Sequence, residues 1–230
     1  MAMLEESRAR DEICRVGQSL FSRGYVHATA GNISVRLDDG YLITPTDACL
    51  GHLQPEQLAK LDLQGRQISG ERASKTIELH RRIYAASAGT PTAAGCIIHT
   101  HSRHLVACSL LASRSDAEEL LPPLTPYFVM KVGRVPHIPY HRPGAPEAAQ
   151  AVAATIARYA EAGRPIRAVM LARLGPNVWH DQPAAAMAAL EELEETAQLW
   201  HWCQQTGANQ VQPLDAQQID ELRQHFGAHW

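Results

Sequence analysis

The segment that most constrains the fold is a short apolar run, Gly95-Cys-Ile-Ile98, followed by the sequence His99-Thr-His101. A run of this kind is typical of a buried strand. Side chains alternate between the two faces of a strand, so His99 and His101 project from the same face and both imidazoles can reach one cation. We therefore expect a buried strand that carries a candidate metal site at its end.

A His-x-His pair on a strand also has a simpler interpretation, as two exposed or hydrogen-bonded histidines. His104 lies three residues beyond His101, where the chain should already be helical. We interpret His104 as a solvent residue, with a hydrogen-bonding role beside the pair as the alternative. The metal hypothesis needs support from other parts of the chain.

Composition predicts a single domain over residues 1–230. The chain is 45% hydrophobic and 20% charged, which provides enough apolar material for a substantial core. Its formal charge is −3, and Lys and Arg are dispersed rather than gathered into a basic patch. The sequence therefore lacks the basic patch that is typical of proteins that bind nucleic acid or an anionic membrane. We expect a small molecule as the binding partner.

Two further features indicate where the protein works. The five cysteines are scattered and form no CxxC motif, so we expect buried free thiols rather than disulfides or a zinc knuckle. The N-terminus is charged where a signal peptide would need an apolar centre. No window approaches the run of about 18 apolar residues that spans a bilayer. We therefore expect a cytoplasmic protein.

Hydrophobic periodicity predicts strands interleaved with helices, the pattern of one layered α/β domain. Two prolines place the segment 134–140 at the edge of a sheet, and Ser74 is the expected N-cap of the second helix. The expected elements are helices over 5–24, from Ser74 onward, 102–111, around Tyr127, 146–163, 183–205 and 214–226, a hairpin over 30–44, strands over 95–100, 134–140 and 166–172, and a turn into a short strand over 175–180.

Two polar turns could hold an anion. Gly31-Asn-Ile-Ser34 and Ile43-Thr-Pro-Thr46 place small amide and hydroxyl side chains beside tight backbone turns. Ser74-Lys75 adds a cation at the start of a helix, where backbone N–H groups favour phosphate. Ordinary turns and a simple N-cap remain the alternative interpretation.

Taken in order, these motifs resemble the class II aldolase/adducin family. The resemblance spans nearly the whole chain. Within the family, the stretches 12–21, 121–130, 132–136 and 191–197 look most like the 3-oxo-tetronate 4-phosphate decarboxylases. The segments that carry the family resemblance are Ala30-Gly-Asn-Ile-Ser34, Ile43-Thr-Pro-Thr46, Ser74-Lys75, His80, Ile98-His-Thr-His-Ser102, Tyr127 and Leu171 through Gly175-Pro176.

The resemblance implies a three-layer αβα class II aldolase-like fold around a largely antiparallel central sheet. It also implies a homotetramer with active sites at subunit interfaces. Tyr127 matches a tyrosine that exchanges a proton in a neighbouring subunit's site. The matched substrate phosphate ligands are Asn32, Thr46, Ser74 and Lys75, and the matched ligands of a divalent metal, zinc or manganese, are His99 and His101.

The chain departs from the family pattern at two positions. Thr76 stands where the family has an acidic residue, and a threonine hydroxyl is no general base near neutral pH without separate activation. Leu174 replaces the third metal histidine, which leaves fewer than the three protein ligands typical of catalytic zinc. The sequence leaves open whether Glu78, His104 or His180 completes the site. Glu78 is about 200 degrees around a helix from Thr76.

Two hypotheses follow. The first is a lyase that acts on a small oxo acid or sugar-phosphate-like substrate, most simply by decarboxylation through an enolate, because this reaction needs less proton abstraction than aldol cleavage. Thr76 and Tyr127 are its candidate catalytic residues. The second is a silent or repurposed family member, which binds or assembles without turnover or performs different chemistry on an unphosphorylated substrate.

Overall fold

The computed structural model describes residues 5–112, 118–205 and 211–230, and its centre is a single sheet. The strands are β1 (Asn32–Arg36), β2 (Gly40–Ile43), β3 (Ala59–Asp62), β4 (Gln67–Ser69), β5 (Cys96–His99), β6 (His137–Ile138), β7 (Ala168–Leu171) and β8 (Gly175–His180). They lie in the order β4-β3-β2-β1-β5-β8-β7-β6. All neighbouring pairs are antiparallel except β6 and β7. The largely antiparallel sheet is confirmed.

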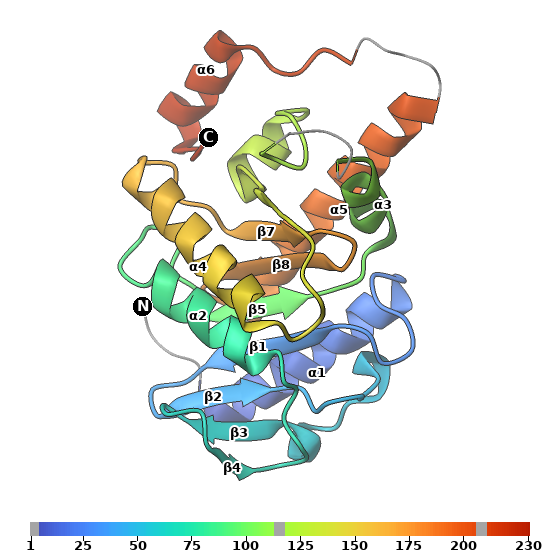
Figure 1. The fold of residues 1–230 in the computed structure, drawn as a ribbon, viewed down its shortest axis with the longest axis vertical. Coiled ribbons are helices and arrows are strands. Elements are labelled where there is room, and N and C mark those ends of the chain that lie inside the picture. Colours follow the sequence, from blue (N-terminus) through green and yellow to red (C-terminus); the bar gives the residue numbers. More distant parts are fainter. Residues whose placement is uncertain (1–4, 113–117, 206–210) are drawn as a thin grey trace.

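One face of the sheet is covered by α2 (Ile77–Ser87) and α4 (Pro146–Glu161), which lie side by side (Figure 1). Ile97 of β5 and Trp179 of β8 pack under these helices in one apolar cluster. This face also carries His99, because side chains two residues apart on a strand share a face.

The opposite face is covered by α1 (Glu6–Ser22), α3 (Arg103–Ala112) and α5 (Pro183–Gln205). Ile98 points to this face, and both Ile97 and Ile98 are fully buried. A strand buried on both faces reads as a continuous apolar run, which is why the sequence reveals β5 so clearly. The helices on two faces of one sheet confirm the predicted αβα layers.

The C-terminal part packs beside a π-helix, Phe128–Val132, which follows Tyr127. Helix α6 (Ala216–Phe226) begins with a capping box between Asp215 and Gln218. Trp230 is buried, with its ring 5.6 Å from that of Phe128. No helix in the described ranges is long and apolar enough to cross a membrane.

The structure corrects several predicted elements. The second helix begins at Ile77 rather than at Ser74, because residues 74–76 form a turn in which Ile77 N donates to Ser74 O at 3.1 Å. The region around Tyr127 forms a π-helix. The segment 175–180 is a strand throughout. Four elements were not predicted from the sequence: the 3-10 helices η1 (Leu50–His52) and η2 (Pro55–Gln57) and the strands β3 and β4. Both strands are short and lie toward or at the edge of the sheet.

Candidate functional site

The candidate site is built on a row of three polar side chains across neighbouring strands. His99 on β5 lies opposite Asn32 on β1 and opposite Asn177 on β8. Directly opposed residues project from the same face of a sheet, and all three side chains are buried. The fold thus brings the predicted residues Asn32 and His99 together. It adds Asn177, which the sequence analysis did not select.

The tautomer of His99 follows from its hydrogen bond. Its Nδ1 lies 2.8 Å from the carbonyl oxygen of Pro176. A carbonyl can only accept, so Nδ1 carries the proton and Nε2 presents a lone pair. Burial, followed by the neighbouring His101, lowers the pKa of His99 to about 4. The ring is therefore neutral near pH 7 and acts at Nε2 as an acceptor or as a ligand.

His101 lies beside His99 with a ring-centroid separation of 5.2 Å. Its ring is also 6.2 Å from the ring of His27, an exposed residue in the loop between α1 and β1. Burial and the nearby His27 lower the pKa of His101. His27 was not predicted as a site residue; its position shortly before the Gly31-Asn32 turn was the available signal in the sequence.

The donor set does not fit a complete metal site. Leu174 packs against the apolar cluster under α2 and α4 and provides no ligand atom. His104 instead bonds to Glu194. His180 bonds to Asp181 and lies opposite Cys96, on the other side of the sheet from His99. Across the part of the chain that the structure describes, no three His, Cys, Asp or Glu side chains lie close enough to hold one ion.

Glu78 does not replace the missing acidic group. It is on the first turn of α2, highly exposed, and 3.6 Å from Arg81 in an ion pair. Regular helix geometry from Ile77 onward turns its carboxylate away from Thr76, as expected.

The polar turns meet at the start of α2. Thr76 Oγ1 accepts hydrogen bonds from Asn32 Nδ2 and from Ser74 Oγ, both at 3.2 Å. The hydroxyl proton of Thr76 therefore remains available for a ligand. Thr46 lies on the adjoining turn, where its backbone N–H donates to Arg72 O at 2.9 Å. Lys75 is exposed at the same turn.

A buried hydrogen-bonded chain lies beneath the row. Ser34 Oγ is 2.7 Å from His80 Nδ1 and 2.8 Å from Tyr84 Oη. Burial lowers the pKa of His80 to about 3, so this imidazole is neutral. His80 Nε2 and both amide atoms of Asn177 are buried and close no hydrogen bond within the described structure. From the sequence, His80 was expected only as part of the family resemblance, without a role.

Tyr127 lies away from this buried row. Its side chain is 62% exposed and stands at the N-terminal end of the π-helix. The next backbone N–H, of Phe128, donates to Thr125 Oγ1 at 3.1 Å. The phenol is thus open to solvent.

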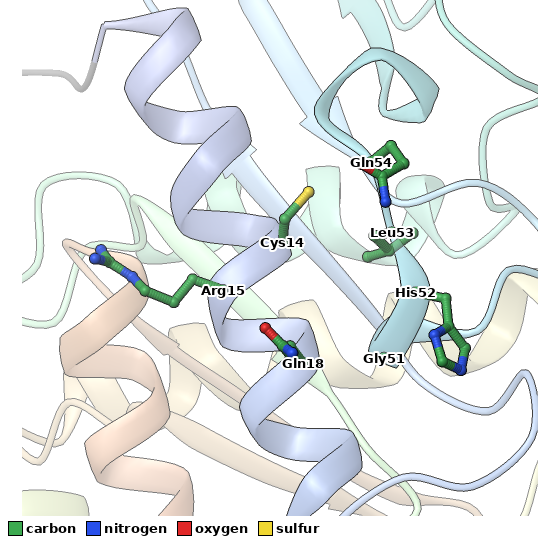
Figure 2. A pocket seen from close by; sticks show the side chains of 7 residues that line it. All are labelled: Cys14, Arg15, Gln18, Gly51, His52, Leu53 and Gln54. Carbon is green, nitrogen blue, oxygen red and sulfur yellow. The ribbon is translucent and has the colours of Figure 1, made fainter.

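A separate cavity of about 360 Å³ lies between α1 and η1 (Figure 2). Burial raises the pKa of Cys14 to about 11, so this thiol is protonated and a poor nucleophile. The cavity contains none of the predicted site residues. It is lined by Cys14, Arg15, Gln18, Gly51, His52, Leu53 and Gln54.

Comparison with known proteins agrees with this architecture. Residues 11–201 match the family described as Class II Aldolase and Adducin N-terminal domain. The chain is 50% identical to the 3-oxo-tetronate 4-phosphate decarboxylase of Cupriavidus necator, over 99% of this chain and 100% of that one. It is 40% identical to the enzyme of the same name from Pectobacterium atrosepticum, over 96% and 95% of the two chains.

Solved structures show the same likeness. YgbL from Klebsiella pneumoniae superposes with a TM-score of 0.82 at 40% identity, over 96% of this chain and 100% of that one. An L-fuculose 1-phosphate aldolase superposes with a TM-score of 0.78 at 22% identity, covering 98% of each chain, which shows a shared fold.

Proposed function

Because the chain belongs to the class II aldolase and adducin family, we propose that it is a carbon–carbon lyase that decarboxylates a small phosphorylated 3-oxo acid. Asn32 carries the proposal. It lies opposite His99 on the sheet and donates to Thr76 at the start of α2, so it joins the histidine pair to the predicted phosphate turn. A substrate bound at that turn would extend toward the histidines.

The proposed reaction breaks the bond between the carboxylate carbon and C2. Carbon dioxide leaves, the electron pair forms an enolate whose oxygen carries the charge, and a proton is then added at C2. The protein must supply hydrogen-bond donors to that oxygen and one proton. The reaction does not require a strong base, so it is compatible with a threonine at position 76 where the family pattern has an acidic residue.

We propose the following division of these tasks among the site residues. Asn32, Thr46, Ser74 and Lys75 would hold the phosphate. His99 presents a lone pair at Nε2 and cannot donate there, since its proton is held by Pro176 O. We propose that the donors to the enolate oxygen are His101 and the hydroxyl proton of Thr76. Thr76 Oγ1 itself accepts from Asn32 Nδ2 and Ser74 Oγ.

The direct test is carbon dioxide release by the purified protein from 3-oxo-tetronate 4-phosphate, the substrate in the name of its relatives. Release with kcat reduced at least tenfold in His101→Ala would support the proposal. No release with or without added zinc or manganese would contradict it.

The predicted cofactor is a divalent ion, and we propose that this chain holds one weakly. His99 fits a ligand role, because its Nδ1 proton is fixed by a carbonyl and its Nε2 is free. Leu174 leaves the third position apolar. Elemental analysis after dialysis would then give far less than one zinc or manganese per chain. Stoichiometric metal would contradict this part of the proposal.

A second candidate function is a silent or repurposed binding protein. The apolar packing of Leu174 and the absence of an acid at Thr76 favour it. Binding of phosphorylated oxo acids without turnover would support this function. An unphosphorylated ligand that phosphate fails to displace would indicate different chemistry. Turnover abolished by His99→Ala would exclude the silent alternative.

We also propose a cytoplasmic homotetramer with sites at subunit interfaces. The exposed phenol of Tyr127 supports a site shared between subunits. Helices α3 and α5, which pack together, carry exposed large apolar side chains that suit a subunit contact. These apolar side chains are Leu110, Leu111, Leu199 and Trp202. Light scattering after gel filtration should give a mass of four times 25.3 kDa.

A further inference from the structure

The histidine pair is followed at once by helix α3, whose first turn needs acceptors for its free backbone N–H groups. Ser102 stands in the N-cap position, since its carbonyl accepts from Val106 N at 3.0 Å. Its hydroxyl, however, pairs with Thr100 Oγ1 at 2.6 Å. The Ser102 hydroxyl therefore braces the turn around His101 instead of capping the helix.

Glu194 on α5 supplies the cap from the other side of the packed helix pair. Its Oε1 accepts from the backbone N–H of His104 at 3.0 Å, and its Oε2 accepts from that of Leu105 at 3.1 Å. His104 Nδ1 also lies 2.9 Å from Oε1 and donates to it. The Glu194 side chain is nearly completely buried, so these bonds replace those it would make with water.

We propose that Glu194 is a positioning residue for His101. The carboxylate is fixed on α5, which lies beside α3 (Figure 1). A negative charge at a helix N-terminus also interacts favourably with the helix dipole. Because His101 is two residues before the first helical residue Arg103, holding the first turn of α3 sets where the His101 imidazole stands relative to His99. This inference rests on the proposed function for its catalytic consequence.

The experiment compares Glu194→Gln with Glu195→Gln. Glu195 is the adjacent residue on the same helix and is exposed, so it is a matched control. We expect Glu194→Gln to lower kcat for carbon dioxide release 10- to 100-fold, roughly the effect of a small misplacement of a reacting group. KM should change little, because the proposed phosphate ligands Asn32 and Ser74 are untouched. Glu195→Gln should match the parent protein.

A second readout does not depend on turnover. NMR of Glu194→Gln should show a shifted His101 imidazole signal and at least tenfold faster exchange of the His104 and Leu105 amide protons. If Glu194→Gln fails to fold, Glu194→Asp keeps the charge but shortens the side chain by one methylene, and the same shifts are expected. Parent-like His101 and amide signals in a folded variant would overturn the positioning role. Unchanged kcat in an active enzyme would overturn it too. Absence of carbon dioxide release by the parent protein would contradict only the proposed function.

Discussion

The imidazole of His99 donates its Nδ1 proton to the carbonyl oxygen of Pro176 across 2.8 Å. This bond joins β5 to β8 two residues beyond Leu174, the position where the sequence predicts that a metal histidine is missing. The strand pairing places Gly175 so close to Thr100 that a Cβ there would lie 1.9 Å from the Thr100 carbonyl oxygen. The backbone around His99 and Thr100 is thus tightly packed against β8.

This retained geometry predicts that metal binding can be restored. The double change Thr76→Glu with Leu174→His should raise zinc affinity at least 100-fold, because it supplies the missing ligand and an acidic neighbour beside a preset His99. Calorimetric titration with zinc measures the effect. Leu174→Met is the control, because it keeps an apolar side chain of similar size. Equal zinc affinity in the double variant and the parent would mean that the pocket has been remodelled more widely.

Stability should fall as the solution becomes acidic. The folded-state pKa values of His99 and His80 are lowered to about 4 and about 3, below the ordinary value of 6.5. The unfolded chain therefore takes up protons before the folded one does. The contribution of these two histidines to the free energy of unfolding is fully present above about pH 6.5 and is lost as the pH falls toward 4 and then 3. Between pH 7 and pH 5, the free energy of unfolding should fall by about 2 kcal/mol for each histidine.

Urea unfolding at several pH values checks this prediction. His80→Gln should flatten the slope of stability against pH, whatever its effect on stability at pH 7, because one buried titrating group is gone. His52→Gln, at an exposed histidine, is the control for the substitution itself. A parent-like slope in His80→Gln would show that His80 is not the group responsible.

Two substitutions separate the role of the Thr76 hydroxyl from that of the shape of the side chain. Thr76→Ser keeps the hydroxyl that accepts from Asn32 and Ser74. Thr76→Val keeps the shape and loses the donor, so kcat/KM should fall about 10- to 100-fold, the effect of losing one hydrogen bond to a charged group. Steady-state kinetics of both variants measure it. If Thr76→Val were as active as Thr76→Ser, the hydroxyl would have no part in the reaction.

The exposed position of Tyr127 predicts that it acts across a subunit interface. Tyr127→Phe should lower kcat at least tenfold with little change in stability, because the side chain is 62% exposed. Tyr140→Phe, at an exposure of 63%, is the matched control. Mixed oligomers of Tyr127→Phe and His99→Ala subunits should regain activity, since some sites then combine two intact residues. If mixing restores nothing while Tyr127→Phe alone is impaired, Tyr127 acts within its own subunit.

Local sequence was sufficient for much of the fold. The apolar run ending at His99 predicts β5, because a strand buried on both faces needs apolar side chains at every position. The amphipathic period predicts α1, α4 and α5 to within a few residues at each end. The strands of the segment 50–69 were not predicted because β3 alternates apolar and polar residues over only four positions and β4 is fully exposed.

The sequence by itself determined the family, the order of layers, and the two departures at Thr76 and Leu174, since each depends on residue type at a given spacing. Tertiary structure alone decided which distant groups meet. Asn177 lies beside His99, His27 lies beside His101, and Glu194 binds the first turn of α3, 90 residues earlier in the chain. Such pairs have no local signal, because strand pairing and helix packing create them. The His99–His101 pair can be recognised from ten consecutive residues of sequence. The tautomer of His99 and the contacts that hold the pair in place arise only in the folded chain.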